Sequence, residues 1–277
     1  MVEAPRIRIT YERINVTKNR KIINVNGPSY KKMGINLEGY TIRKWWFAGK
    51  YIYAYLVKEN NPSYVIRTHL MMYGKIILND TIEVNPKLTP FMILELDNGN
   101  KLTWYLSQVK LLDPFCKSDL IKSNYTTCSS KEVINYSITM TKYDISHKNF
   151  DRDLLIKHIK TNFAEIADDM LVDVLLNQKY FPGVGNILQQ EALYRCKLLP
   201  TRAVKSIPFE DIECLIDELK KIIDILYEAY LNKGKNMLYQ PILQIYHKSV
   251  CPLGHKTITK YLGYHDRRTT WCPIDQK

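Results

Sequence analysis

The spacing of the apolar residues changes part-way along this 277-residue chain. Up to about residue 112, short runs of β-branched and aromatic residues are separated by turn sequences, which is typical of strands. In the second half, apolar residues recur three and four positions apart, which places them on one face of a helix. No βαβ repeat is apparent. The pattern therefore predicts a β-rich part followed by a helical part, an α+β arrangement.

One turn in the first part is especially clear. The pair Asn98-Gly99 lies between two apolar runs, and Asn-Gly accepts the positive φ angles of a tight hairpin. The flanking runs, residues 91–96 and 101–106, are therefore predicted to pair as a β-hairpin. Further strands are predicted over residues 51–57, 64–70 and 75–78.

The segment between about residues 113 and 149 is polar and rich in Ser, Thr and Asn. It is the best candidate for an interdomain linker. Beyond it, apolar spacing predicts short helices over residues 153–162 and 164–176.

A longer helix is predicted further along the chain. Its apolar stripe, which we expect to pack in a core, comprises Ile212, Leu215, Ile216, Leu219, Ile222, Ile223 and Leu226. Ser206 is a suitable N-cap, Pro208 suits the first turn and Gly234 suits a C-terminal stop.

A glycine-rich turn over residues 181–186 separates two of these helices and ends in Asn186 as the predicted N-cap. Such a turn leaves backbone N–H groups at the positive end of a helix, where they can bind a phosphate without reading bases. The alternative is an ordinary elbow between two helices.

Near the C-terminus, Cys251 and His255 form one pair of candidate metal ligands, and Cys272 and Asp275 form a second. Two ligand pairs separated by a hairpin-length insert suit a structural Zn²⁺. Asp275 stands where a fourth Cys is expected, and a carboxylate oxygen can also bind zinc. The alternative is a hairpin that carries incidental cysteines. The remaining cysteines are expected to be thiols rather than disulfides, because we expect a reducing compartment.

The chain carries 40 Lys and Arg against 28 Asp and Glu, a formal charge of +12. This surplus favours a polyanionic partner, either nucleic acid or an anionic membrane surface. The alternative is that the charge merely increases solubility. No apolar run of about 18 residues and no apolar segment near the N-terminus is present, so we expect an intracellular protein without a membrane span. GxGxxG and GxxxxGK loops are absent, which argues against a nucleotide cofactor.

Taken together, these features resemble the formamidopyrimidine-DNA glycosylase/endonuclease VIII (Fpg/Nei) family, in particular its endonuclease VIII-like branch of animals and large DNA viruses. The resemblance extends over nearly the whole chain. It rests on residues 1–5, 49–51, 69–74, 183–186, 243–246 and 267–272. Each motif alone is weak, but their order and spacing in one chain are specific.

The resemblance implies a domain order. It comprises an antiparallel β-sandwich catalytic domain over 1–112, a linker over 113–149, a helix–two-turn–helix domain over 150–240 and a zinc finger over 241–277. It further implies a monomer that binds DNA containing oxidised bases or abasic sites, with the damaged nucleotide flipped out of the stack. Zinc would be a structural cofactor. A viral source would place the protein in the nucleus or at a cytoplasmic viral replication site.

The resemblance also implies the catalytic residues. After removal of Met1, the α-amine of Val2 would attack C1′ of the damaged nucleotide and form a Schiff base, which leads to strand cleavage by elimination. Glu3 would supply the acid that opens the sugar, and Lys50 would lie near the reacting sugar. The family pattern has proline where this chain has Val2, and many relatives have an acidic residue where this chain has Arg6.

For DNA binding, the resemblance implies that His69, Asn186 and Arg267 hold phosphates beside the lesion, with Arg268 as the alternative to Arg267. Met72 would fill the space left by the flipped nucleotide. Two further space-filling residues of the family have no clear counterpart here, so we expect a preference for single-stranded or bubble DNA, where no base pair must be broken. The rival hypothesis is a DNA-binding module of the same fold without turnover.

Overall fold

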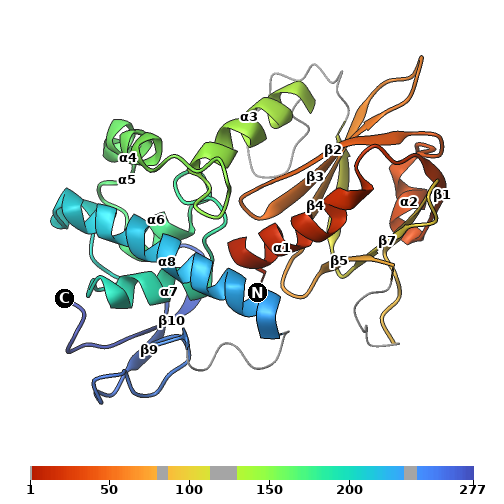
Figure 1. Cartoon of the computed structure of the whole chain (residues 1–277). Helices are drawn as coiled ribbons and strands as arrows, with labels where there is room; N and C mark the ends of the chain where they lie inside the picture. The colour runs from red at the N-terminus through yellow and green to blue at the C-terminus, as the bar shows by residue number, and fades with distance from the viewer. Residues whose placement is uncertain (1, 80–86, 113–129, 234–241) are drawn as a thin grey trace. The chain divides into compact units, whose positions relative to one another are not determined.

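The computed structural model of the chain describes residues 2–79, 87–112, 130–233 and 242–277. The chain forms two compact units (Figure 1). The first unit comprises Met1–Val2 and Ile7–Thr139, and the second comprises Glu3–Arg6 and Met140–Lys277. Two helices, α1 (Ala4–Ile14) and α3 (Ser130–Tyr143), supply residues to both units.

The first unit contains two antiparallel sheets. One sheet has the strand order β1-β6-β7-β5 and the other has the order β2-β3-β4-β8. The strands are β1 (Ile22–Asn26), β2 (Thr41–Ala48), β3 (Tyr51–Val57), β4 (Tyr64–His69), β5 (Lys75–Leu78), β6 (Met92–Leu96), β7 (Lys101–Tyr105) and β8 (Gln108–Leu112), with η1 (Asn15–Thr17) and α2 (Pro28–Met33) before β2. Apolar side chains from both sheets and from α1 form one core, in which Trp104 is fully buried.

The strand predictions in this unit are confirmed. Strands β3 and β5 have the predicted bounds, and β4 ends one residue earlier than predicted. The predicted hairpin joins β6 to β7, with Leu96 N–H donating to Asn100 O and with Gly99 at φ 79°. Asn-Gly chemistry thus determines the register of these two strands.

Helix α1 is absent from the sequence prediction, which assigned the first part of the chain mostly to strands. Residues 6–11 alternate between apolar and polar side chains, as a strand does. The helical spacing of Ala4, Ile7, Tyr11 and Ile14 is also present, and this face is the one that contributes Ile7 and Ile14 to the core. Tertiary packing therefore decides between two patterns that overlap in the sequence.

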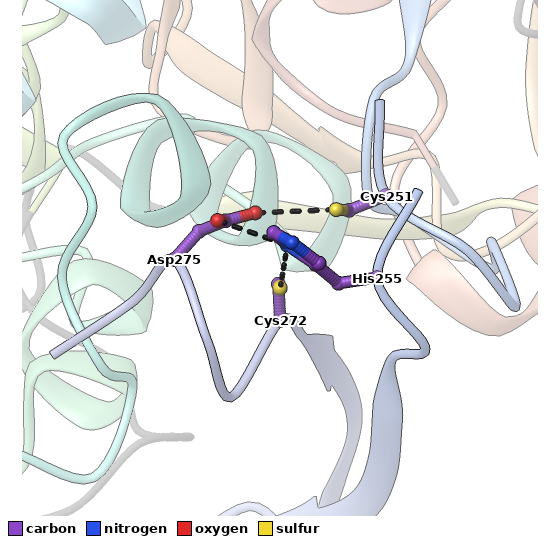
Figure 2. A group of neighbouring side chains, drawn as sticks. All are labelled: Cys251, His255, Cys272 and Asp275. Atoms are coloured by element: carbon purple, nitrogen blue, oxygen red, sulfur yellow. Dashed lines mark hydrogen bonds and ion pairs between the residues drawn. The ribbon is translucent and has the colours of Figure 1, made fainter. Parts of the chain in front are cut away.

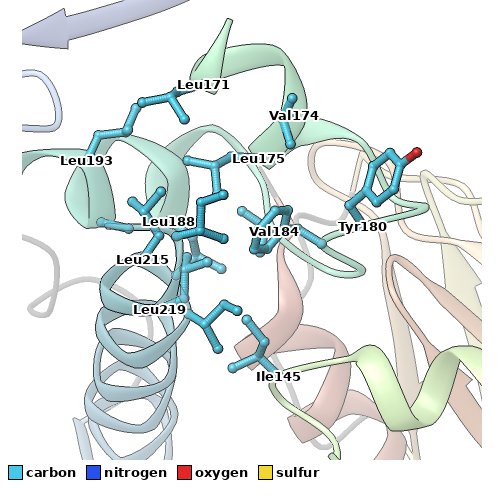
Figure 3. Packing of buried hydrophobic residues seen from close by; sticks show 14 of the residues in the cluster. Ile145, Leu171, Val174, Leu175, Tyr180, Val184, Leu188, Leu193, Leu215 and Leu219 are labelled. Carbon is cyan, nitrogen blue, oxygen red and sulfur yellow. The ribbon is translucent and has the colours of Figure 1, made fainter. Parts of the chain in front are cut away.

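The second unit is mostly helical. Its elements are α4 (Arg152–Thr161), α5 (Phe163–Ile166), α6 (Leu171–Leu176), α7 (Asn186–Arg195), η2 (Val204–Ser206), α8 (Phe209–Lys233), β9 (Ile258–Leu262) and β10 (Arg267–Trp271), and β9 pairs antiparallel with β10. Figure 3 shows part of its core, where Leu188 of α7 meets Leu215 and Leu219 of α8.

The apolar stripe predicted for the long helix is buried along α8, as expected. The predicted N-cap is wrong: Ser206 lies in η2, and its hydroxyl donates to Ala203 O. Gly234 lies outside the described residues. None of the helices in the described ranges is both long and apolar enough to cross a bilayer.

Two further predictions need correction. The predicted helix over 164–176 is interrupted after α5, because residues 167–171 form backbone hydrogen bonds with residues 202–205 instead. Part of the predicted linker over 113–149 is the helix α3, whereas 113–129 lies outside the described residues. The buried face of α3 includes Ser137 and Thr141, so small polar residues hide its helical period.

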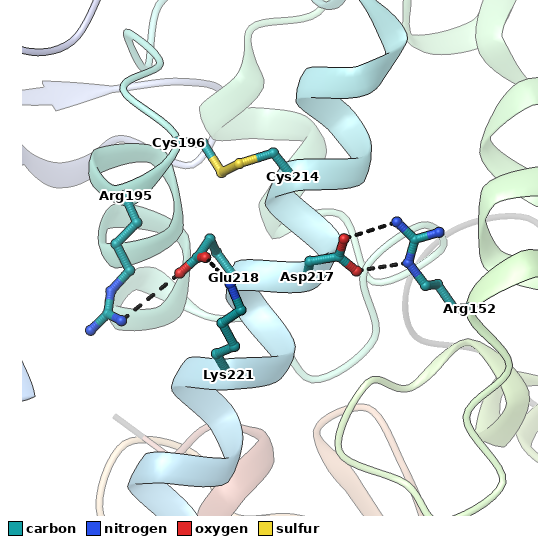
Figure 4. The surroundings of a disulfide bond; sticks show 7 residues. All are labelled: Arg152, Arg195, Cys196, Cys214, Asp217, Glu218 and Lys221. Carbon is teal, nitrogen blue, oxygen red and sulfur yellow. Dashed lines mark hydrogen bonds and ion pairs between the residues drawn. A yellow bond between two sulfur atoms is a disulfide. The ribbon is translucent and has the colours of Figure 1, made fainter.

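A disulfide joins Cys196, the C-cap of α7, to Cys214 of α8, with Cα atoms 6.2 Å apart (Figure 4). This finding contradicts the expectation of free thiols outside the metal cluster, because the turn between α7 and α8 brings together residues 18 positions apart. Closing a loop of this length stabilises a fold by about 3 kcal/mol in the chain-entropy account. On the same helix, Asp217 accepts hydrogen bonds from Arg152 of α4.

Candidate active site and metal centre

The carboxylate of Glu3 occupies the N-terminus of α7. Its Oε1 accepts a hydrogen bond from Ile187 N–H at 2.9 Å, and its Oε2 accepts one from Leu188 N–H at 3.1 Å. Only 4% of Glu3 is exposed. The positive end of the helix dipole and two otherwise unpartnered N–H groups therefore stabilise a buried carboxylate.

This arrangement uses two of the N–H groups that were expected to be available for a phosphate, and a phosphate contact elsewhere at the glycine turn stays a prediction. The anion bound by the Ile187 and Leu188 N–H groups is the protein's own Glu3. The predicted N-cap is wrong, because Gly185 is the N-cap residue and Asn186 is the first residue of α7.

Position 185 requires a glycine because the Glu3 carboxylate leaves no room for a side chain there. A Cβ on Gly185 would lie 2.4 Å from Glu3 Cδ, which is far inside van der Waals contact. The chain beside Glu3 is also tied to the turn, since Ala4 N–H donates to Gly183 O at 3.0 Å. The spacing of the glycine motif thus matches the space that Glu3 needs.

Asn186 supports the hairpin strand β10 instead of capping its own helix. Its Nδ2 donates to Arg268 O at 2.9 Å, and the side chain is buried. Gln190, one turn further along α7, also donates to Arg268 O and accepts from Thr270 N–H at 2.8 Å. Both residues position the backbone next to the predicted phosphate contact Arg267.

The side chains of Arg267 and Arg268 are both exposed. Arg268 Nη1 lies 3.4 Å from His247 Nδ1, and burial together with this cation lowers the pKa of His247. His247 therefore favours its neutral form, in which Nδ1 can accept a hydrogen bond. The assignment of a phosphate contact to Arg267 stays a prediction.

In the first unit, Lys50 and His69 lie close together. Lys50 follows Gly49 in the turn between β2 and β3, and His69 ends β4. Burial lowers the pKa of His69, and the cations of Lys50 and Arg67 lower it further. Met71 N–H donates to His69 Nδ1 at 3.1 Å, so this nitrogen is unprotonated. The neutral ring then carries its proton on Nε2, where it can donate to a phosphate oxygen.

The predicted space-filling residue Met72 is 48% exposed in the turn after β4. A neighbouring residue that was not predicted is Leu106, between β7 and β8, which is 50% exposed and has φ 48°. A Cβ on Gly74 would lie 2.8 Å from Leu106 O, so the two turns are adjacent. A large apolar residue at the turn after a strand is the sequence feature that could have identified Leu106 as a second space-filling residue.

The side chain of Val2 belongs to the apolar core of the first unit and is buried. The side chain of Arg6, the departure from the family pattern, lies over the ring of Tyr230 in α8, with 5.9 Å between the guanidinium carbon and the ring centroid. The first residues of the chain are therefore anchored on both sides of Glu3.

Glu191 of α7, a further residue that was not predicted, is fully buried. Its carboxylate accepts hydrogen bonds from the backbone N–H groups of Gln244, Ile245 and Tyr246, at 2.8–2.9 Å. It thereby anchors the segment that leads to the cysteine pairs. Burial of a Glu in the middle of a helix has no local sequence signal.

Cys251, His255, Cys272 and Asp275 converge as predicted, with their ligand atoms within 4.8 Å of one another (Figure 2). Asp275 lies 3.1 Å from Cys251 Sγ and 3.1 Å from His255 Nδ1, and Cys272 Sγ lies 3.8 Å from His255 Nδ1. Tetrahedral ligands around one Zn²⁺ lie about 3.3–3.8 Å apart, given metal–ligand bonds of about 2.0–2.3 Å. The donor set and its spacing therefore fit zinc.

Tyr194 of α7 packs against this cluster together with Ile245. Burial and a hydrogen bond with Cys251 raise the pKa of Tyr194, so its hydroxyl stays protonated and donates to the sulfur. A donor of this kind orients a ligand and balances thiolate charge, as outer partners of metal sites do.

Comparisons with known proteins match the chain to DNA glycosylases. The formamidopyrimidine-DNA glycosylase H2TH domain family matches residues 143–237. The chain is 53% identical over 276 residues to an endonuclease 8-like protein of Acanthamoeba polyphaga mimivirus, with all of both chains covered. A formamidopyrimidine-DNA glycosylase of Bacillus cereus is 28% identical over 249 residues, which cover 87% of this chain and 82% of that protein.

Solved structures agree with these matches. A viral DNA glycosylase superposes with a TM-score of 0.92 at 52% identity over all of both chains. The Fpg of Lactococcus lactis, in complex with DNA containing an abasic site, superposes with a TM-score of 0.71 over 99% of both chains. At 19% identity, this second likeness shows the fold alone.

The fold and the matches define the class as a DNA glycosylase with an H2TH domain. More specifically, the chain belongs to the Fpg/Nei family and to its endonuclease VIII-like branch of animals and large DNA viruses.

The position of Glu3 leads to a stability prediction. Glu3→Ala leaves the N–H groups of Ile187 and Leu188 buried without acceptors, so we expect the free energy of unfolding to fall by about 2–3 kcal/mol in urea denaturation. Glu3→Gln keeps one acceptor oxygen and should cost about 1 kcal/mol. The control is Glu12→Ala, which removes a surface pair with Arg8 and should change stability by less than about 0.5 kcal/mol. Equal effects of Glu3→Ala and Glu12→Ala would contradict the prediction.

Proposed function

We propose that this protein is a bifunctional DNA glycosylase and AP lyase of base excision repair, acting on oxidised bases, chiefly pyrimidines and hydantoins. The observation that carries the proposal is the buried carboxylate of Glu3 at the N-terminus of α7, one residue after Val2. A rigid acid next to the chain's own amine is the pair of groups that Schiff-base chemistry needs.

In the proposed reaction, the α-amine of Val2 attacks C1′ of the damaged nucleotide, and the bond from C1′ to the base breaks. A primary amine loses two protons as the Schiff base forms: one neutralises the departing base, and Glu3 can transfer the other to the deoxyribose ring oxygen as the bond from C1′ to that oxygen breaks. The two N–H donors interact best with an ionised carboxylate, so this proton arrives in the course of the reaction. Strand cleavage then follows by β- and δ-elimination.

Val2 is suited to this role in one respect and limited in another. A free α-amine has a pKa of about 7.7–8.0, so a useful neutral fraction exists near neutral pH. Val2 is β-branched and offers a primary amine, so we expect slower attack than from proline. Lys50 would act beside the sugar, and His69, Asn186 and Arg267 would hold the flanking phosphates.

The rival function is DNA binding without turnover. The net charge of +12, the hairpin and the exposed arginines serve both functions. The combination of Val2, Glu3 and Lys50 favours the enzyme. In either case we propose a monomer that acts where DNA is replicated or repaired, in the nucleus or at a cytoplasmic viral replication site.

Borohydride trapping on DNA with an abasic site tests the mechanism. We expect a covalent complex whose mass equals that of the DNA plus the chain beginning at Val2, less one water lost on condensation and plus two hydrogens added by reduction. The matched control adds Gly-Ser in front of Val2, which moves the amine away and should abolish the complex. If a chain shown by mass spectrometry to begin at Val2 gives no complex, the Schiff-base mechanism is wrong.

For the metal, we propose one structural Zn²⁺ per chain held by Cys251, His255, Cys272 and Asp275. Metal analysis should find one zinc per chain, and Asp275→Ala should weaken zinc binding by more than the roughly 10–100-fold typical of losing an outer partner. Asp275→Cys should restore tight binding, because thiolate is a strong zinc ligand. Asp266→Ala, on the hairpin turn, is the control. Full zinc retention by Asp275→Ala would remove that residue from the set.

For the DNA form, we propose a preference for single-stranded or bubble DNA. Unstacking in duplex DNA costs about a few kcal/mol, which space-filling side chains must offset. Single-turnover rates on one lesion in matched single-stranded and duplex DNA should favour the single strand. A faster duplex reaction that Leu106→Ala abolishes would show instead that Leu106 supplies the missing surface beside Met72.

A further inference from the structure

One face of the β2-β3-β4-β8 sheet lies outside the apolar core of the first unit. In the strand register, Tyr51 pairs with His69, and Tyr53 pairs with Arg67. Residues that pair directly point to the same side of a sheet, as do residues two positions apart on one strand. The register therefore places on this face Thr41, Lys44, Trp46, Ala48, Tyr51, Tyr53, Tyr55, Val57, Val65, Arg67, His69, Gln108, Lys110 and Leu112. Helix α3 covers part of the face, since Trp46 Nε1 donates to Ser137 Oγ.

Arg67 is a cation on this face to which the catalytic and DNA-binding assignments give no role. It is half-buried, and its guanidinium lies over the ring of Tyr51, 5.0 Å from the centroid. The ring of Tyr51 in turn lies 5.1 Å from that of His69. Tyr51 thus holds the guanidinium close to the imidazole that we assign to a phosphate.

Several cations lie near His69. Lys50 and Arg67 are both close enough to disfavour the protonated form of His69. The register places Lys110 of β8 directly opposite Arg67. Lys50, Arg67 and Lys110 thus bring three cations to the neighbourhood of His69, and such a group attracts a polyanion.

The spacing and the chemistry suit the backbone of one DNA strand. Arg67 and His69 are two residues apart on β4, about 6.6 Å along the strand, which is close to the spacing of neighbouring phosphates. A guanidinium presents a planar fork of N–H donors that matches phosphate oxygens. Stacking on Tyr51 leaves the edge of the guanidinium, where these donors lie, directed away from the ring face.

We propose that Arg67, positioned by Tyr51, binds the backbone phosphate next to the one held by His69. The proposal rests on the proposed role of His69 and extends the DNA interface along β4 toward Lys110. In this role, Arg67 strengthens DNA binding and positions the damaged strand, and it takes no part in the chemistry at C1′.

The test is the salt dependence of binding to DNA that contains a tetrahydrofuran abasic analogue. Each phosphate contact contributes about 0.7–0.9 to the slope of log affinity against log salt. Arg67→Gln should lower the slope by about this amount and weaken binding at low salt, whereas Arg67→Lys should keep most of the slope. Tyr51→Phe keeps the ring and should behave as the wild type. The control is Arg43→Ala, an exposed arginine near the other end of β2.

The outcomes separate this proposal from the one on which it rests. If His69→Ala weakens binding while Arg67→Gln leaves both slope and affinity unchanged, Arg67 is not a phosphate contact and the His69 assignment stands. If neither variant changes binding, both assignments fail. A loss with Arg43→Ala equal to that with Arg67→Gln would show only a general effect of net charge and would overturn the proposal. Wild-type unfolding midpoints for the variants exclude misfolding as the cause.

Discussion

The arrangement of the second unit depends on the hydrogen bonds between Glu3 and the N-terminus of α7. They join residues more than 180 positions apart in the sequence and hold a carboxylate where water is excluded. Breaking such a bond leaves both a buried charge and buried N–H groups unsatisfied, which makes the arrangement strongly preferred over a shifted one. The carboxylate that we propose as the catalytic acid is therefore held in place by backbone N–H groups.

Helix α7 extends this constraint to the rest of the unit. Three of its buried polar side chains bind two other segments: Asn186 and Gln190 bind β10, and Glu191 binds residues 244–246. Tyr194 contacts the metal cluster, and the disulfide at Cys196 ties the end of the helix to α8. Hydrogen-bonded polar groups in a core specify one geometry more sharply than apolar packing does. Through α7, the acid, the arginine-bearing strand and the metal cluster form one rigid group.

Several features of the fold and the site were predictable because their sequence signals are local. The Asn98-Gly99 hairpin, the apolar stripe of α8 and the convergence of the two ligand pairs follow from turn chemistry, helical period and ligand spacing. The rest depends on contacts distant in sequence. The helix over residues 4–14 also alternates like a strand, and the buried face of α3 carries small polar residues. Neither the pairing of Cys196 with Cys214 nor the anion bound by α7 has a local signal.

The close approach of Gly185 to Glu3 has a consequence for how this protein can vary. Any side chain at position 185 would collide with the carboxylate, and any shorter residue at position 3 would leave the helix without its cap. The two positions cannot change one at a time without loss of stability or of the acid. They should therefore be retained together in relatives that need both this helix cap and the acid that we propose. Joint loss of the pair would mark a relative in which the carboxylate is no longer needed.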